Sequence, residues 1–327
     1  MTTQQADIII ANPIYDVVFK NLMTTAKGTN RDIAGYFVGT ILGEEIEDIE
    51  LLPQEYTYHT KLGEKAKQQK GGDTLTLIRL DFVATIRTRS GEHKKVLIEI
   101  QKSKKPTDLL RFRTYLGEQY KQTDTKKSKD DRPEDVLPIV IIYMLGFTLS
   151  EIGSIAVKVN RTYIDMLCGD ELKYKNPFIE CLTHDAYFIQ VPRIDRNTYA
   201  EWERCSELEQ MLSLFEQNYF VEEDFYKRYP YPITDKRIKK MVETLEYIAA
   251  DPKTRRIMQE EYWAALNETI WESQVTALTK ENAAQANKIK TQANKIKTQA
   301  KEKAAQAHEI TTLRRLLKQA GIEIPPA

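Results

Sequence analysis

The sequence predicts an α/β fold, and three observations support this prediction. Two strand-like runs, 74–88 and 95–101, flank the turn residues 89–92, which predicts a β-hairpin. A helical apolar spacing follows over 109–120. A continuous, β-branched apolar run over 137–145 then has the pattern of a strand that is buried on both faces. Strands and a helix in this order indicate an α/β domain.

Length and composition limit the class of protein. The chain has 327 residues, 41% of them apolar, which is enough to build a packed core. Forty-eight basic and 48 acidic residues cancel, so a uniformly basic nucleic-acid coat is excluded. Three cysteines without C-x-x-C spacing are typical of a reducing compartment. The longest apolar stretch, 139–147, is too short to cross a bilayer, so we expect a cytoplasmic protein with no membrane partner.

Helices are predicted before the hairpin. Apolar residues three to four apart indicate a short helix over 14–22 and a second helix over 30–42, which Gly43 ends. Residues 46–52 alternate as a strand. The lysine-rich stretch 56–72 is expected to be a loop.

The second half of the chain is predicted to be mainly helical. Residues 187–191 add a strand, and helical spacing recurs over 200–220 and 233–250. A repeat tail follows, so we expect three parts along the chain. These are a core over 1–195, a helical extension over 196–270 and a tail over 271–320.

The tail contains a seven-residue repeat. The heptapeptide NKIKTQA occurs twice in succession, at 287–293 and 294–300, with alanine at one heptad position and mostly Ile or Leu three residues later. Residues 280–318 carry ten Lys or Arg against three Glu, a net charge of +7. We expect a basic coiled-coil helix that joins copies of the chain into a homo-oligomer. A solvated single helix without a partner is the alternative.

The hairpin register brings two carboxylates together. A tight turn centred near Ser90 pairs residues whose numbers sum to 180, so Asp81 is expected opposite Glu99 and Arg79 opposite Gln101 on the same face. Two facing carboxylates require a cation between them, and oxygen ligands suit Mg²⁺ or Mn²⁺. Such a metal leaves positions for a phosphate and an attacking water, which is the chemistry of phosphodiester hydrolysis. A solvated strand face is the alternative.

These residues also resemble a known motif. Asp81 in IRLDFV and Glu99-Ile100-Gln101 look like the D-xn-E-x-Q variant of the PD-(D/E)XK nuclease motif. The order of motifs, over roughly residues 10–230, resembles that of the Rpn-type recombination-promoting nucleases, also described as PD-(D/E)XK family transposases. Four elements carry the resemblance: Asp16-x-x-Phe19-Lys20, the D…IEIQ hairpin, the helix with Arg111 and Tyr115, and the apolar strand 138–143.

The resemblance implies a restriction-endonuclease-like αβββαβ core and a divalent-metal-dependent DNA endonuclease of low sequence specificity. It makes Asp81 and Glu99 metal ligands, with the Ile100 carbonyl as a further ligand. Gln101 stands where most of the superfamily has lysine, and a glutamine orients the attacking water without supplying a positive charge. The implied biological context is recombination, a mobile element or defence.

The missing positive charge has two candidate sources. Lys102 follows Gln101, although strand alternation points it to the opposite face unless a bulge rotates it. Lys20 lies one turn from Asp16, which the resemblance makes a further residue of the metal site. A plain i,i+4 ion pair between Asp16 and Lys20 is the alternative.

A phosphate contact is expected on the helix after the hairpin. Arg111 and Tyr115 are four residues apart, where a guanidinium and a phenol can hold a DNA phosphate. Packing of that helix on the sheet is the alternative. The rival for the whole protein is a catalytically decayed nuclease fold that acts as a DNA-binding or oligomerising assembly protein.

Overall fold

The computed structural model describes most of the chain: residues 8–25, 28–52, 55–60, 74–79, 82–101, 106–121, 136–194 and 201–321. The chain divides into two compact units, Met1–Glu260 and Glu261–Ala327. None of the described helices combines the length and the apolar character that a membrane-spanning helix requires.

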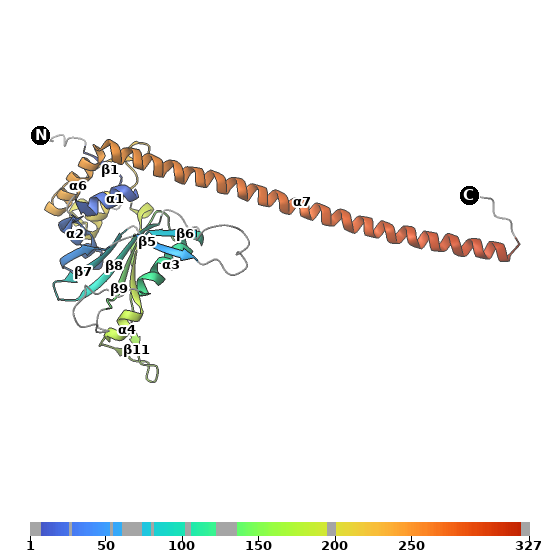
Figure 1. The fold of residues 1–327 in the computed structure, drawn as a ribbon, viewed down its shortest axis with the longest axis horizontal. Helices are drawn as coiled ribbons and strands as arrows, with labels where there is room; N and C mark the ends of the chain where they lie inside the picture. The colour runs from blue at the N-terminus through green and yellow to red at the C-terminus, as the bar shows by residue number, and fades with distance from the viewer. Residues whose placement is uncertain are drawn as a thin grey trace. The chain divides into compact units, whose positions relative to one another are not determined.

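A six-stranded mixed sheet forms the centre of the first unit (Figure 1). Its strands, in order across the sheet, are β10 (Ala156–Val159), β13 (His184–Gln190), β9 (Ile139–Leu145), β8 (His93–Gln101), β7 (Phe82–Thr88) and β4 (Ile46–Leu51). The strands β4, β7 and β8 are antiparallel neighbours, whereas β8, β9 and β13 run parallel. The predicted α/β class is therefore confirmed, and the predicted buried strand lies in the middle of the sheet as β9.

The elements of this sheet follow one another as helix, three antiparallel strands, helix and parallel strand. The helices are α2 (Arg31–Leu42), before β4, and α3 (Pro106–Lys121), between β8 and β9. Gly43 ends α2 as predicted, with a φ of 72° that a glycine adopts without a steric penalty. The parallel step from β8 to β9 requires the crossover that α3 provides.

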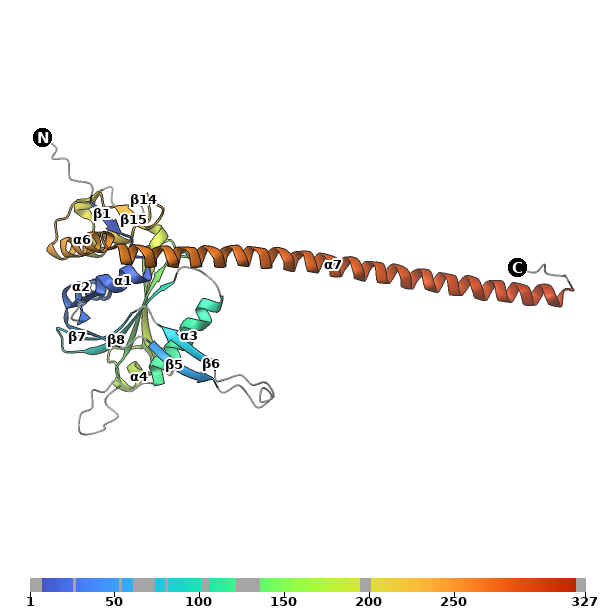
Figure 2. The same cartoon turned by 45° about the horizontal axis from the view of Figure 1, so that its top comes forward.

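Helices cover both faces of the sheet, with α2 and α3 on opposite sides (Figure 2). On one face, Phe19 of α1 (Asp16–Met23) contacts Phe82 of β7, with ring centroids 6.3 Å apart. On the other face, Phe112 of α3 belongs to a buried apolar cluster with Leu97 of β8. Successive strand residues project to opposite faces, so even-numbered and odd-numbered residues of β8 meet different helices.

The strand predicted over 74–88 is wrong, because it is two strands in two sheets. The first, β6 (Thr74–Arg79), pairs with β5 (Glu55–Thr60) in a separate two-stranded sheet, with Arg79 opposite Glu55. The predicted pairing of Arg79 with Gln101 is therefore wrong, and the predicted loop contains a strand. The Tyr and Thr residues of β5 favour extended backbone. The loop was predicted from the lysines that follow them in the sequence, which outweighed this preference.

The helix predicted over 200–220 is also wrong. Within the described residues 201–220, only α5 (Glu207–Leu212) is α-helical. A 3₁₀ turn lies before it (Trp202–Arg204), another follows it (Ser213–Phe215), and β14 starts at Phe220. Ser206 and Glu209 form a capping box, which begins the helix at Glu207. The remaining elements of the first unit that pack nearby are β1 (Ile9–Ala11), β14 (Phe220–Glu222), β15 (Tyr226–Arg228) and α6 (Lys236–Ala249).

Small elements were not predicted. A hairpin of β2 (Thr24–Thr25) and β3 (Gly28–Thr29) precedes α2, and β11 (Tyr163–Ile164) pairs with β12 (Glu171–Leu172). The short helix α4 (Pro177–Leu182) leads from β12 into β13.

The second unit contains most of α7 (Pro252–Gln319), which begins in the first unit. The predicted tail helix is confirmed. The side chains of Ile289 and Ile296, which share one heptad position, are 65% and 66% exposed in the single chain. Association of this helix with a second copy stays a prediction.

Candidate functional site

The β7–β8 hairpin has the predicted register. Phe82 pairs with Ile98 and Val83 with Leu97, so the paired numbers sum to 180. Asp81, the predicted partner of Glu99, lies outside the described residues. The pairing of the two carboxylates stays a prediction, with which this register is consistent.

Glu99 is buried in the centre of the sheet, with 2% of its surface exposed. It has the same strand parity as Leu97, which packs with Phe112, so its side chain projects to the face that α3 covers. The alternative of a solvated strand face is therefore wrong for Glu99. Burial of a carboxylate costs several kcal/mol, roughly, unless the charge is paired, hydrogen-bonded or bound to a metal.

Aromatic rings lie on the same face of the sheet as Glu99. Tyr143 of β9 is the direct neighbour of Glu99 in the parallel ladder. Burial, and after it the negative charge of Glu99, raises the pKa of Tyr143 above its usual range. The ring centroids of Phe112 and Phe188 each lie 4.7 Å from that of Tyr143, and Phe188 stacks on it. The aromatic rings lower the local dielectric constant, which strengthens the attraction between a carboxylate and a cation.

The end of β8 contains the next predicted residues. Ile100 is buried and, by strand alternation, projects to the face opposite Glu99. Gln101 is the last residue of β8 and pairs with Leu145. The side chain of Gln101 and the whole of Lys102 lie outside the described residues, so their roles stay predictions.

Asp16 and Lys20 form an ion pair on α1. The Lys20 Nζ lies 2.7 Å from Asp16 Oδ2, as the alternative of a plain i,i+4 pair predicted. Between them in sequence, Phe19 contacts Phe82, which directly follows Asp81 in the chain. The helix that carries the pair is therefore packed at the start of β7, and a role for either residue in a metal site stays a prediction.

The structure brings Tyr115 into the core rather than onto the surface. It is 6% exposed and lies in the same buried cluster as Phe112 and Leu97. This is the packing that the sequence left open as the alternative to a phosphate contact. The side chain of Arg111 is not among the described ones, so its contact with a phosphate stays a prediction.

The described residues contain no cluster of three or more His, Cys, Asp or Glu side chains that can hold a metal. Asp81 is not among those residues. The donors that the candidate site offers are oxygens, since its described carboxylates are Glu99 and Asp16 and its predicted further ligands are the Asp81 carboxylate and the Ile100 carbonyl. Oxygen donors fit Mg²⁺ or Mn²⁺ and do not favour a softer metal such as zinc.

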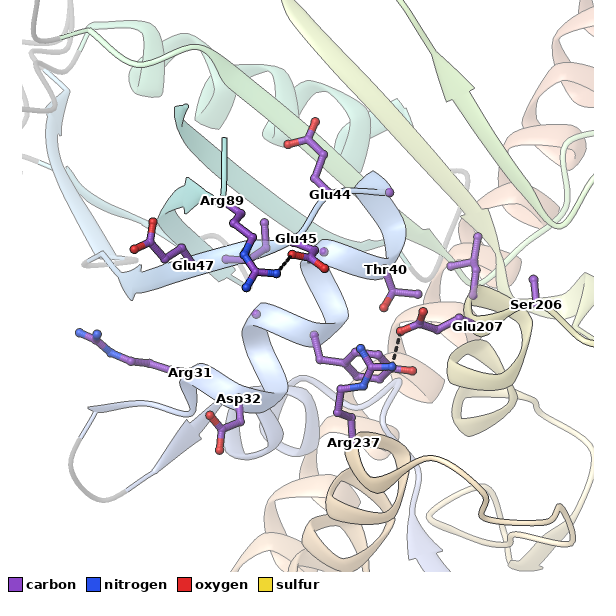
Figure 3. Close-up of a pocket in the computed structure, with 16 residues that line it drawn as sticks. Arg31, Asp32, Thr40, Glu44, Glu45, Glu47, Arg89, Ser206, Glu207 and Arg237 are labelled. Atoms are coloured by element: carbon purple, nitrogen blue, oxygen red, sulfur yellow. Dashed lines mark hydrogen bonds and ion pairs between the residues drawn. The ribbon is translucent and has the colours of Figure 1, made fainter. Parts of the chain in front are cut away.

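A cavity of about 850 Å³ lies elsewhere in the first unit, and Glu99 does not line it (Figure 3). Residues of α2, of the turn between α2 and β4, and of the first turns of α5 and α6 surround it. Each arginine that lines it is already in an ion pair: Arg31 with Asp48, Arg89 with Glu45, and Arg237 with Glu207. An anionic ligand would have to compete with these acidic partners.

Tyr143 was missed by the reading of the sequence. The run 137–145 identified a buried strand, but nothing in it indicates which of its residues meets Glu99. That contact depends on the parallel pairing of β8 with β9, which only the completed crossover through α3 sets.

No protein-family model, curated protein or solved structure matches this chain.

Proposed function

We propose that this chain is a divalent-metal-dependent DNA endonuclease that hydrolyses phosphodiester bonds with little sequence preference. The observation that carries the proposal is Glu99, a carboxylate buried on a central strand, in a hairpin whose register leads toward the pairing of Asp81 with Glu99. The Glu99 side chain is only 2% exposed, so it is not a solvated surface group. Charged side chains are rarely buried to this degree unless they have a partner.

The element order supports the same proposal. Three antiparallel strands, a crossover helix and a parallel strand, preceded by a helix, agree with a restriction-endonuclease-like αβββαβ core. The resemblance to the Rpn-type nucleases belongs to the same proposal. It rests on four elements: Asp16-x-x-Phe19-Lys20, the D…IEIQ hairpin, the helix with Arg111 and Tyr115, and the apolar strand 138–143.

In this proposal each residue has one task. Asp81, Glu99 and the Ile100 carbonyl would hold Mg²⁺ or Mn²⁺, which when bound would supply a Lewis acid for the phosphate and the attacking water. Gln101 orients that water by hydrogen bonds. A lysine, Lys20 or Lys102, stabilises the negative charge that develops on the phosphate. The aromatic rings on the α3 face exclude competing water from the carboxylates.

Cleavage of supercoiled plasmid by the purified full chain tests the proposal. We expect nicking with Mg²⁺ or Mn²⁺ and none with EDTA. The substitutions Glu99→Gln and Asp81→Asn are expected to slow nicking about a hundredfold or more, because a lost metal ligand removes several kcal/mol of transition-state stabilisation. Circular dichroism checks that each variant is folded.

Glu92→Gln is the matched control. It makes the same change in the same hairpin, at a side chain that is 62% exposed and pairs with Lys94. We expect its nicking rate to equal that of the wild type. Folded Glu99→Gln protein that nicks at the wild-type rate, or nicking that continues in EDTA, would contradict the proposal.

A second candidate function, a non-catalytic assembly protein, is favoured by one observation. The apolar heptad residues of α7, such as Ile289 and Ile296, are exposed in the single chain. An unpartnered apolar seam is typical of a helix that associates. In this case the chain binds DNA or itself but never cuts, and the three glutamate and aspartate variants behave as the wild type does.

A further inference from the structure

The segment 159–182, which contains β11, β12 and α4, exposes large apolar side chains. Met166 and Leu167, between the two strands, are 97% and 99% exposed, and Tyr174 and Phe178 are 89% and 72% exposed. In Figure 1 this segment lies at one end of the first unit, and α6 lies at the other. Large apolar surfaces that face water mark sites of interaction.

The turn that carries Met166 and Leu167 is well ordered by hydrogen bonds. The Leu167 N–H donates to Asp165 Oδ1 at 2.8 Å, and the Gly169 N–H donates to the Asp165 carbonyl at 2.8 Å. Gly169 has a φ of 82°, in the left-handed region that favours glycine. Asp165 and Gly169 therefore fix the turn in a conformation that leaves the side chains of Met166 and Leu167 exposed to solvent.

Arg161 holds the segment to the central sheet. Its Nε lies 2.7 Å from Asp185 Oδ1 on β13, and its Nη2 lies 2.8 Å from Glu180 Oε2 on α4. Each of these three side chains is 16% exposed. A partner thus meets a surface that is already positioned, which lowers the entropic cost of binding.

The exposed apolar area and the net charge of the segment indicate which kind of partner it can bind. Its exposed apolar side chains present on the order of 1,000 Å², if a large side chain has ~170 Å², against about 800 Å² per partner in a standard interface. Residues 159–182 carry four acidic and three basic side chains, a net charge of −1. This balance does not favour DNA or an anionic membrane, and it suits a surface that pairs with itself.

We propose that the segment 159–182 pairs with the same segment of a second copy of this chain. Among the described residues, β12 has a single strand neighbour, β11, which leaves its other edge open. When two β12 strands meet antiparallel about a two-fold axis at Leu172, Glu171 of each copy faces Lys173 of the other. The pairing is independent of the proposed chemistry, because no residue of the candidate site lies in the segment.

Cross-linking through Cys168 tests this pairing in the full chain. Cys168 is exposed beside Leu167, and the variant Cys181→Ser/Cys205→Ser leaves it as the one thiol. In this antiparallel arrangement the two Cys168 residues lie up to about 25 Å apart along the paired strands, so the cross-linker is a bismaleimide with a poly(ethylene glycol) spacer of that reach. We expect it to give a covalent dimer, and expect Leu167→Asp to lower the yield about tenfold or more, since it places a carboxylate in an apolar interface. Tyr247→Asp, at a 79% exposed position on α6, is the matched control with an unchanged yield.

A charge exchange tests the two-fold arrangement. Glu171→Lys places two lysines face to face in each half of the interface, so its dimer yield is expected to fall. The double variant Glu171→Lys/Lys173→Glu restores opposite charges and is expected to restore the yield. An isologous interface requires this rescue, because each copy supplies both members of each pair.

The tail is tested in the same experiment. Ile296→Lys, in α7, is expected to leave the Cys168 cross-link unchanged. The proposal is overturned by sedimentation of the wild type as a monomer with no cross-link, or by a cross-link that persists at full yield in Leu167→Asp. It is also overturned if the protein sediments as a dimer but Cys168 gives no cross-link. A double charge variant that fails to recover the cross-linking yield overturns it too.

Discussion

At the scale of single residues, Lys227 is a lysine whose side chain is buried in the core. Burial lowers its pKa from 10.5 to about 7, although the charge of Glu216 acts in the opposite direction. The Nζ donates to the backbone carbonyls of Ser213 and Glu216. The neighbouring Tyr229 has its pKa raised to about 12, mainly by burial, so it stays protonated over the range in which Lys227 titrates.

Lys227 is expected to make stability depend on pH. Because its folded pKa is below its unfolded pKa, the unfolded state binds more protons between about pH 7 and 10.5, and stability rises with pH. One proton gives a slope of at most about 1.4 kcal/mol per pH unit. Urea unfolding at pH 7.5 and 9.5 measures it, and Lys227→Met is expected to remove it. An equal rise in both proteins would contradict this assignment.

Two buried glutamines differ in their hydrogen bonding. Gln119 of α3 is 2% exposed, and within the described part of the chain neither of its amide atoms has a partner. Gln190 of β13 is fully buried, but its amide donates to the carbonyls of Ile152 and Ser154 and accepts from the Leu149 N–H. One amide is therefore a cost to stability and the other is integrated into the fold.

Exchange of these glutamines for methionine is expected to change stability in opposite directions. Gln119→Met removes an unsatisfied amide and is expected to raise the free energy of unfolding by about 1–3 kcal/mol. Gln190→Met leaves three backbone groups without their partner and is expected to lower it by at least about as much. Chemical denaturation measures both. If Gln119→Met instead destabilises the protein, the amide of Gln119 has a hydrogen-bond partner after all.

At the scale of elements, the junction of α2 with β4 depends on Gly39 as well as on Gly43. A Cβ at Gly39 would lie 2.6 Å from the Glu44 carbonyl oxygen, which belongs to the turn into β4. A Cβ at Gly35, one turn earlier, would meet Ile46 and Ile49 at an ordinary 3.8 Å. The close approach of backbone at Gly39 lets the chain turn directly from the helix into the sheet.

The two glycines are expected to respond differently to alanine. Gly35→Ala gains helix propensity and is expected to stabilise the protein by about 0.5–1 kcal/mol. Gly39→Ala forces backbone apart and is expected to destabilise it by about 1–3 kcal/mol. Thermal unfolding followed by circular dichroism measures both. Equal effects would show that the turn into β4 relaxes freely around the added methyl group.

At the scale of the whole molecule, self-association has two possible sites, the segment 159–182 and the tail helix. The heptad isoleucines Ile289 and Ile296 are about two-thirds exposed in the single chain. A partner helix is expected to cover them, as hydrophobic seams of this period require. The alanines at the neighbouring heptad position make the seam narrow, so the association is expected to be weak.

Lysine on the seam is expected to prevent association of the tail. We expect Ile289→Lys/Ile296→Lys to lower the sedimentation-equilibrium mass of the full chain at a given concentration. Thr291→Lys/Thr298→Lys adds the same charge at the same spacing outside the seam and is expected to behave as the wild type. If all three proteins have equal mass, the tail is a solvated single helix.

Local chemistry determined much of the fold from the sequence alone. The turn 89–92 and the alternation around it were sufficient for the hairpin register, and Gly43 was sufficient for the end of α2. The apolar run of β9 indicated a strand buried on both faces. Each of these features depends on residues that are neighbours in the chain, where turn geometry and side-chain period leave few options.

Only the tertiary structure decided what surrounds the candidate site. It paired Glu99 with Tyr143 through a crossover, buried Glu99 and partly buried Tyr143 on the face that α3 covers, and moved β6 with Arg79 into a separate sheet. These outcomes depend on residues that are distant in the chain, and a strand pattern does not specify its neighbour or its cover. The sequence thus determined the chemistry that Glu99 offers, whereas the packing of distant elements decided that it is buried.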